Sequence, residues 1–397
     1  EKYVCPKEMS IKNVKRAVIE EVFCMRNAIP LPETVVIQSA KCNLRFLHSF
    51  LNDKDTKNFE AASDSEDFFA VDGILYSKDK KTLIKCPTGK TGHVAIPDGT
   101  EFINDNAFLH SKISSVKFPE NSISMGKDIF RGSAVSNINF GNNITQIGGY
   151  EKNVFANCNN LIEVEIPPSV LRIGDGTFLN CKNIKTVILH EGLRYIDAKA
   201  FYGCSNLHEI KIPSTVQYVG NRCLADVYNL IISKPLSGLL YAFTDTFCNN
   251  GDKYSVKKLT TSEGILYMPN RLKHLDMCKI NLTSANEYPP ANLYIYAATT
   301  ELKQDTAYWI YKHEDETDSV NFDKVKKYLR RCAKQMTMRY MESDDEKSFA
   351  NFVSEGFLSK AALKELFKLA SKENRTTISA YLLKVMGEEA KNYTFKL

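Results

Sequence analysis

The segment Cys86 to Gly92, with the sequence CPTGKTG, contains Gly-Lys-Thr, the residues that end a phosphate-binding loop. Such a loop also needs a glycine five positions before Gly89, so that free backbone N–H groups can surround the phosphates. Position 84 is Ile84 instead, and it lies in an apolar-polar run that predicts a strand. The residues from His93 to Pro97 predict a second strand rather than a helix. We therefore expect a turn at Pro87 to Lys90 and no nucleotide site.

Other residue types that could form catalytic or metal sites lack the spacing that such sites need. The seven histidines are scattered, and no pair of them has the spacing of a metal site. The chain has no nucleophile elbow and no dinucleotide-binding loop. Glu163 and Glu165 are the closest candidates for an acid–base pair, but an open surface would not give two carboxyl groups different pKa values. The sequence thus predicts a non-enzymatic protein without catalytic, cofactor or metal residues.

The cysteines bear on the cellular compartment. There are eleven, so at least one is unpaired, and the smallest gap between neighbours is 18 residues, from Cys24 to Cys42. This spacing excludes CxxC motifs. Free thiols persist most easily in a reducing compartment, which favours a cytoplasmic location. The chain starts at Glu1 without an initiator methionine, so it is consistent with a processed protein, and a secreted or cell-surface location stays open.

Bulk composition is that of a globular protein. Of the 397 residues 43% are hydrophobic and 25% are charged, and the formal net charge is +5. This charge is too small for such a length to indicate nucleic acid as a partner. No apolar run is long enough to span a bilayer.

An internal repeat organises the middle of the chain. Three segments that begin at Cys158, Cys181 and Cys204 align without gaps at intervals of 23 residues. Upstream, two units that end at Phe108 and Phe130 repeat the scheme at 22 residues, and the next unit carries an insertion. A period of this length with a short strand per unit is typical of a solenoid. We predict an α+β protein: about six repeats of 22–26 residues with one strand each, followed by a C-terminal helical domain.

Alternation within a repeat predicts which side chains face inward. In the strand from Glu163 to Ile166, Val164 and Ile166 point into the core and the two glutamates point outward. The phenylalanines equivalent to Phe178 fill the core. The cysteine at the start of each aligned segment is interpreted as a small buried side chain, with a metal or redox ladder as the alternative.

This repeat resembles the BspA-like (Treponema pallidum type) leucine-rich repeats of bacterial proteins. The family pattern "IP..V..IG..AF..C..L..V" is matched by Ile166-Pro167, Val170, Ile173-Gly174, Phe178, Cys181, Ile184 and Val187. The resemblance covers about Phe68 to Leu230. It also implies a hairpin over Phe69 to Asp79 at the entry to the solenoid. The resemblance implies a role in recognition or adhesion at bacterial surfaces, and the helical tail is similar to tails found on many such proteins.

Four segments follow from these patterns. Residues 1–66 have no assignable fold apart from one helix expected over Ile11 to Met25. Residues 67–235 form the solenoid with its entry hairpin, 236–290 a mixed strand extension, and 291–397 the helical domain. Ser359 is expected to cap a helix and Gly387 to end the last one. Apolar residues at helical spacing predict buried faces: Phe322, Val325, Leu329 and Cys332; Leu363, Leu366, Phe367 and Ala370; Ile378, Tyr381, Leu382 and Val385.

The outward residues of the strands predict a continuous concave stripe that binds a protein or peptide. Its members are Ser115, Lys117, Asn137, Asn139, Glu163, Glu165, Thr186, Ile188, Glu209 and Lys211. Because few of them are apolar, the interface should be polar and sensitive to salt. Tyr150, in the insertion from Gly148 to Asn153, is a further candidate contact.

Two alternatives remain open. Six basic residues lie on one predicted helix, 322–334, and three of them form a stripe that would suit nucleic acid, anionic lipid or an acidic partner; the six are Lys324, Lys326, Lys327, Arg330, Arg331 and Lys334. A solvated helix face is favoured over nucleic acid or anionic lipid, because we expect no stacking aromatic residues within this run and the basic charge is local. The other alternative is an enzyme with an unrecognised site outside the repeats.

Overall fold

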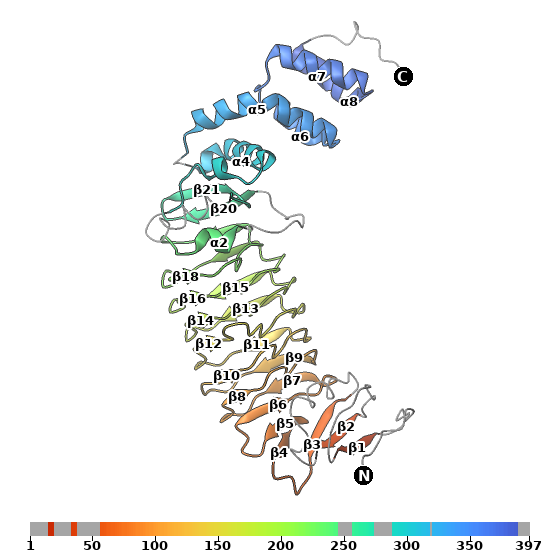
Figure 1. Cartoon of the computed structure of the whole chain (residues 1–397), viewed down its shortest axis with the longest axis vertical. Coiled ribbons are helices and arrows are strands. Elements are labelled where there is room, and N and C mark those ends of the chain that lie inside the picture. The colour runs from red at the N-terminus through yellow and green to blue at the C-terminus, as the bar shows by residue number, and fades with distance from the viewer. Residues whose placement is uncertain are drawn as a thin grey trace.

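A computed structural model of the chain describes residues 15–19, 33–37, 56–244, 256–273, 288–317 and 320–387. The molecule is elongated (Figure 1). Strands are stacked along most of its length, and the helices of the C-terminal region lie at the far end from the first strands. The predicted α+β architecture, a leucine-rich-repeat type solenoid followed by helices, is confirmed.

The expected entry hairpin is present. Strand β4 (Phe68–Val71) pairs antiparallel with β5 (Ile74–Ser77). The two residues between them, Asp72 and Gly73, have φ angles of 48° and 72°. This conformation is the one that two-residue hairpin turns require and explains the Asp-Gly pair. Strand β6 (Thr82–Lys85) then pairs with β5 and carries the chain into the first repeat.

The CPTGKTG segment is a turn, as predicted. The Lys90 N–H donates to the Pro87 carbonyl at 3.2 Å, which closes a four-residue turn. Strand β7 (Thr91–Ala95) follows it directly. No helix N-terminus is therefore present at this point to bind phosphates.

Each repeat contributes one longer strand and one two-residue strand, and strands of each kind stack in parallel as a long-strand ladder and a short-strand ladder. Among the described residues, hydrogen bonds join the longer strands into three sheets and the short strands into two. The longer strands are β7, β9 (Lys112–Lys117), β11 (Asn137–Asn139), β13 (Glu163–Ile166), β15 (Thr186–Leu189), β17 (Glu209–Lys211) and β19 (Asn229–Ile231). The short strands are β8 (Phe102–Ile103), β10 (Ser124–Met125), β12 (Gln146–Ile147), β14 (Arg172–Ile173), β16 (Tyr195–Ile196) and β18 (Tyr218–Val219). The short strands line one edge of the solenoid in Figure 1 and the longer ones lie across from them. The prediction of one strand per repeat is thus incomplete, since each repeat has a second, two-residue strand.

A column of stacked phenylalanine rings forms the centre of the core. Phe108, Phe130, Phe155, Phe178 and Phe201 come from five consecutive repeats, and all are fully buried. Neighbouring ring centroids are 4.5, 4.9, 5.5 and 5.5 Å apart, and the planes of neighbouring rings differ by at most 15°. The repeat therefore places the same ring in the same environment at each turn, which is how a solenoid buries apolar area only between neighbours.

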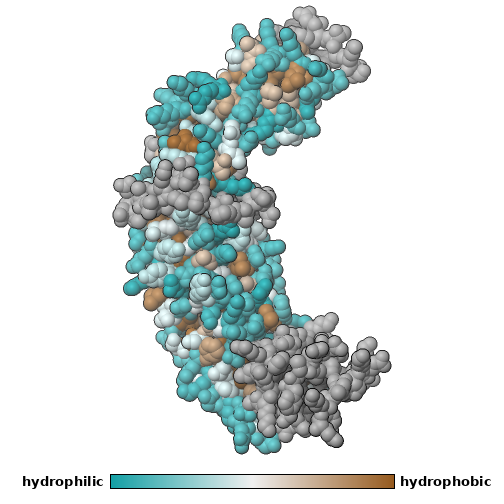
Figure 2. Space-filling view, viewed as in Figure 1, coloured by the Kyte–Doolittle hydropathy of each residue, from teal (hydrophilic) through white to brown (hydrophobic). Residues whose placement is uncertain are grey.

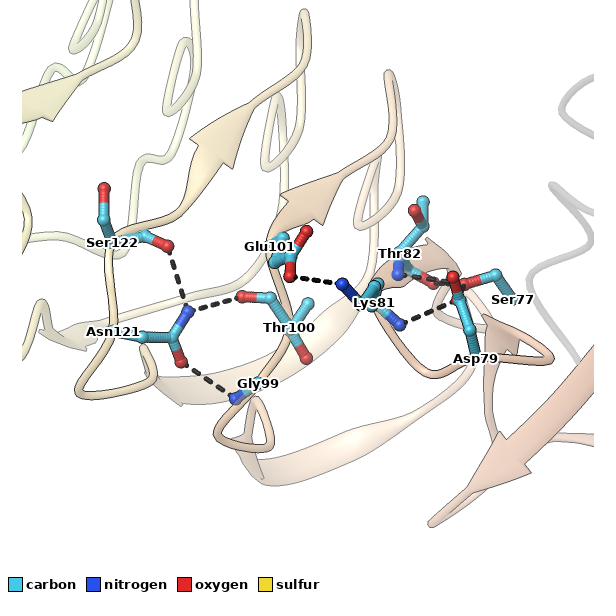
Figure 3. A network of polar contacts seen from close by, with 9 residues as sticks. All are labelled: Ser77, Asp79, Lys81, Thr82, Gly99, Thr100, Glu101, Asn121 and Ser122. Carbon is cyan, nitrogen blue, oxygen red and sulfur yellow. Dashed lines mark hydrogen bonds and ion pairs between the residues drawn. The ribbon is translucent and has the colours of Figure 1, made fainter.

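Polar side chains join the turns of successive repeats (Figure 3). The Asn121 amide accepts from the Gly99 N–H at 2.9 Å and donates to the Thr100 carbonyl at 2.8 Å. Lys81 and Glu101 form an ion pair at 2.8 Å. One step earlier, the Asp79 carboxylate accepts from the Ser77 hydroxyl, and this hydrogen bond lowers the pKa of Asp79.

The long-strand ladder continues past residue 235. After helix α2 (Leu239–Phe243), strand β20 (Val256–Thr261) pairs parallel with β19, and β21 (Gly264–Pro269) pairs antiparallel with β20. The change to antiparallel pairing ends the stacking of parallel turns. The domain limits at residues 66, 235 and 290 remain our proposed division.

The N-terminal segment contains a small parallel sheet. Strands β1 (Arg16–Ile19), β2 (Thr34–Ile37) and β3 (Asn58–Ala61) pair in that order. The helix expected over Ile11 to Met25 is thus wrong at β1, and the rest of that range lies outside the described residues. A run of four residues such as Arg-Ala-Val-Ile is compatible with a helix or a strand, and its pairing with β2 makes it a strand here.

The C-terminal region is helical. It contains the 3-10 helices η1 (Leu293–Tyr296) and η2 (Glu314–Glu316) and the α-helices α4 (Thr300–Lys312), α5 (Phe322–Glu342), α6 (Glu346–Ser354), α7 (Lys360–Lys372) and α8 (Thr376–Met386). Ser359 accepts from the Ala362 N–H at 3.2 Å, and Gly387 ends α8 with φ 69°. Both predictions are confirmed. Val385, expected on a buried face, is 39% exposed. Among the described helices, none combines the length and the apolar content needed to cross a bilayer.

Candidate interaction surface

The predicted surface residues form two parallel rows on the long-strand ladder, which we call the strand stripe. Ser115 and Ile188 are half-buried, and the other eight members are exposed. Register aligns them across the strands: Asn137 lies opposite Ser115, Asn139 opposite Lys117, Glu163 opposite Thr186, and Glu165 opposite Ile188. The ladder thus brings these side chains onto one face, whereas their role in binding stays a prediction.

The stripe extends beyond the predicted residues at both ends. His93 lies opposite Ser115, and its Nδ1 is 2.9 Å from the Ser115 hydroxyl. At the other end Asn229 lies opposite Glu209 and donates to it at 2.6 Å. The repeat interval of 22 residues from Ser115 back to His93 was the signal that could have found the first extension. With β20, eight strands at about 4.8 Å give a face about 34 Å long.

The stripe carries charges of both signs, with Lys117 and Lys211 on either side of the three glutamates. Glu165 pairs with His190 at 2.9 Å, and Lys117 lies 3.7 Å from Glu120. Glu163 makes no ion pair with any described residue. Exposed pairs of this kind add little to stability. They therefore leave the stripe free to exchange internal ion pairs for contacts with a partner.

Tyr150 projects from the insertion beside the repeats. It is 80% exposed. The loop around it is held by the Glu151 N–H, which donates to Asp175 at 3.3 Å, and by the Gln146 amide, which donates to the Gly148 carbonyl at 2.6 Å. A large aromatic side chain is thus presented to solvent on a loop that hydrogen bonds hold in place.

The short-strand ladder carries a second column of larger side chains. Arg172, Tyr195 and Tyr218 lie opposite one another in register. The Arg172 guanidinium lies 5.0 Å from the Tyr195 ring centroid and pairs with Asp197 at 3.0 Å. Arg and Tyr are frequent at interface hot spots, so this column is the main competitor of the strand stripe.

The basic helix is α5, and the structure divides its six cations into paired and unpaired groups. Lys326 pairs with Glu314, and Lys334 pairs with Glu365. The other four form no ion pair with a described residue; they are Lys324, Lys327, Arg330 and Arg331. The expected absence of aromatic residues from this run is wrong, since Tyr328 lies within it. The Tyr328 ring lies 5.1 Å from the Lys303 ammonium group and 5.7 Å from the Arg331 guanidinium group.

The repeat cysteines are buried and hydrogen-bonded between repeats. The thiols of Cys158, Cys181 and Cys204 donate to the carbonyls of Phe130, Phe155 and Phe178, each in the preceding repeat, at 3.0, 3.0 and 3.2 Å. Burial raises the pKa of Cys204 and of Cys181. A protonated thiol is a weak donor and a poor metal ligand. The burial of all three thiols and their hydrogen bonds between repeats fit the structural interpretation. The described part of the chain contains no group of three or more potential metal ligands.

A cleft in the helical region was not anticipated. It lies between α4 and α6, and its lining includes Asp305, Tyr308, Trp309 and Lys312 of α4, and Glu355 just after α6. These residues come from separate segments of the chain, so no local sequence motif predicts the cleft. On the face of the molecule that Figure 2 shows, hydrophilic side chains predominate and hydrophobic ones are scattered.

Comparison with known families accounts for the repeats. The model of the BspA type leucine rich repeat region matches residues 86–151 and 149–265, in six copies. The matched residues, 86–265, make up just under half of the chain, and in this region the chain is similar to BspA-type repeats. The match confirms the resemblance found in the sequence. No curated protein matches the chain.

Several solved structures are similar to the BspA-type repeats. A leucine-rich cell surface protein from Faecalibacterium prausnitzii A2-165 shares 23% identity, with a TM-score of 0.36 and coverage of 55% of each chain. A leucine-rich repeat protein from Eubacterium ventriosum shares 17% identity, with a TM-score of 0.38 and coverage of 49% of this chain and 59% of that one. A leucine-rich repeat protein of T. pallidum shares 20% identity, with a TM-score of 0.28. The similarity covers 43% of this chain and 87% of that one. The chain thus spans little more than half the length of the first two.

Proposed function

We propose that the chain is a non-enzymatic recognition or adhesion module that binds an extended protein segment along the strand stripe. BspA-type repeats in general indicate protein interaction or adhesion. The observation that supports the stripe as the site is its register, which sets exposed polar side chains of consecutive repeats directly opposite one another. Such a row matches the length of an extended peptide better than it matches a small molecule.

The composition of the stripe indicates the chemistry of the partner. Two lysines and three glutamates alternate with asparagine, threonine and serine, so the partner should present charges of both signs and hydrogen-bonding groups. Binding should weaken as salt rises, because exposed charges are screened within about 8 Å at physiological ionic strength. Tyr150, in the insertion that directly follows the short strand β12, is a further exposed aromatic side chain that a partner could contact.

Photo-crosslinking tests this assignment against its main competitor. A photo-reactive amino acid is placed at Thr186 on the stripe or at Tyr218 on the short-strand ladder, since both positions are exposed. With protein extracts of the source organism and its surroundings, we expect a discrete crosslinked product from position 186 only. A product from position 218 alone would move the binding face to the Arg172, Tyr195 and Tyr218 column.

An acidic partner at α5 is a second candidate. The unpaired cations and the ring of Tyr328 between Lys303 and Arg331 favour it. Phosphates and carboxylates are the groups that such a surface attracts. Retention on a heparin column that depends on Lys327 and Arg331 would support this candidate, and elution at low salt with or without the substitutions Lys327→Glu and Arg331→Glu would count against it.

A further inference from the structure

The cleft between α4 and α6 has the size of a ligand site. Its volume is about 610 Å³, within the range of roughly 300–1,000 Å³ that is usual for small-molecule pockets. Helix α4 turns one face to it, with Asp305, Tyr308, Trp309 and Lys312 at helical spacing. The other wall consists of α6 and the residues that flank it, and Figure 1 shows α4 lying next to α5 and α6.

One end of the cleft is an acidic site that the chain's own cation occupies. Glu355 accepts from the Lys312 ammonium group at 2.7 Å through Oε1 and from the Tyr311 hydroxyl at 3.2 Å through Oε2. The Glu355 side chain is 17% exposed, whereas that of Lys312 is 50% exposed. The carboxylate is thus fixed and shielded, and the ammonium group ends a half-exposed, flexible chain that can move away.

Aromatic rings and an unused hydroxyl line the middle of the cleft. Trp309 is 39% exposed and stacks on His313 with the centroids 4.7 Å apart. The Tyr308 phenol oxygen is buried and has no hydrogen-bond partner among the described residues. Burial raises the pKa of Tyr308, so the hydroxyl stays protonated at neutral pH. Ring faces attract cations, and such an oxygen can accept a hydrogen bond from an N–H group.

The remaining charges in the cleft favour a cation over an anion. Asp305 is paired with Arg339 from α5. The Asp345 carboxylate accepts from the Ser348 N–H at the start of α6 and has no cationic partner among the described residues. An incoming anion would face Asp345 and Glu355, whereas an incoming cation can replace Lys312 and leave the charge balance unchanged.

We propose that this cleft binds an alkylguanidinium or alkylammonium group, which displaces Lys312 from Glu355 and packs against Trp309. Lys312 then acts as an internal competitor that holds the acidic site in the free protein. The ligand group belongs either to an arginine or lysine side chain of a protein or to a free organic amine. This site is separate from the strand stripe and does not depend on it.

The single tryptophan of the chain makes the proposal testable, because all tryptophan emission comes from Trp309. The full chain is titrated with agmatine, with an acetylated Gly-Arg-Gly amide, and with the same peptide carrying norleucine as the neutral control, and calorimetry gives the affinities. We expect saturable changes with the first two ligands and none with the third. Tighter binding of the peptide identifies a protein side chain as the ligand, and tighter binding of agmatine identifies a free amine.

Two substitutions with opposite effects separate binding from misfolding. Lys312→Ala should tighten binding by about fivefold, the scale of a half-exposed ion pair, and loss of folding cannot produce a gain. Glu355→Gln keeps the shape of the side chain and should weaken binding by at least about tenfold. Lys334→Ala removes the same charge from an ion pair outside the cleft and should change nothing. Equal binding of the norleucine peptide, no binding of either cation, or unchanged affinity in both cleft variants would overturn the proposal.

Discussion

The Cys181 thiol donates a hydrogen bond to the Phe155 carbonyl at 3.0 Å, across the boundary between two repeats. The same contact recurs one repeat earlier and one repeat later. In the preceding repeats the equivalent position is Ser133 and then Ser111, both buried. A small side chain with a hydrogen-bond donor is therefore the common feature of this column.

We predict that Cys181→Ser is tolerated better than Cys181→Ala. Serine keeps a small side chain with a hydrogen-bond donor beside the Phe155 carbonyl, whereas alanine leaves a buried carbonyl without this partner. The alanine variant should lose about 1–3 kcal/mol of unfolding free energy, measured by urea denaturation. Equal stability of the alanine variant and the parent would show that the thiol hydrogen bond has no stabilising role.

The ring stack predicts a larger effect at Phe155. This ring is stacked between Phe130 and Phe178, with centroids 4.9 and 5.5 Å away. Phe155→Ala should cost about 3–5 kcal/mol because it opens a cavity in the middle of the column. Tyr150→Ala, at an 80% exposed position five residues earlier, should leave the urea midpoint unchanged. Similar midpoints for the two variants would refute the central role of the stack.

Because Lys85 is buried, we predict that the free energy of unfolding changes with pH. Its side chain is 1% exposed and donates to the Asn106 carbonyl at 2.8 Å, and burial lowers the pKa of Lys85 to about 8 from its ordinary value of 10.5. Between these two values the unfolded chain binds more protons than the folded one, so stability rises with pH. Relative to Lys85→Met, the parent should gain up to about 3 kcal/mol from pH 8 to pH 10.5. A constant difference in unfolding free energy between the two proteins across this range would contradict the lowered pKa.

We predict that a side chain at position 174 would cause a steric clash between two repeats. A Cβ atom at this position would collide with the backbone of Gly149 in the preceding repeat. Backbone atoms cannot yield as a flexible side chain can, so Gly174→Ala should separate the two repeats and lower the urea midpoint. As a control, Ala200→Gly alters a buried position in the next repeat without adding an atom, and it should cost less. A Gly174→Ala midpoint equal to that of the parent would show that the repeats can adjust.

The sequence predicted the repeat core and the strand stripe because both depend on short-range patterns that recur. The alternation in Glu163 to Ile166 and the interval between Cys158 and Cys181 determine which side chains face inward. The two-residue strands, such as Arg172–Ile173, give no alternation long enough to detect. Strand β1 was missed because four residues fit a helix or a strand until a partner strand is known.

The cleft escaped prediction for a different reason. Trp309 lies in α4 and Glu355 directly follows α6, and only the packing of α4 against α5 and α6 brings them to the same cleft. Each face alone looks like the solvated side of an amphipathic helix. The exposure of Val385 is similarly a consequence of packing, since a helical pattern shows that a face is apolar but not whether another helix covers it.

Reversing charges on the strand stripe tests most directly whether a partner binds there. The test compares three forms in a capture experiment against protein extracts of the source organism: the parent, Glu163→Lys/Glu165→Lys on the stripe, and Asp64→Lys/Glu66→Lys at two exposed positions outside it. The two variants change charge equally at the same spacing. We predict that a partner is captured by the parent and by the Asp64/Glu66 control, and that the stripe variant loses it while keeping the parent's urea midpoint. Equal capture by all three forms would contradict the assignment of binding to the stripe.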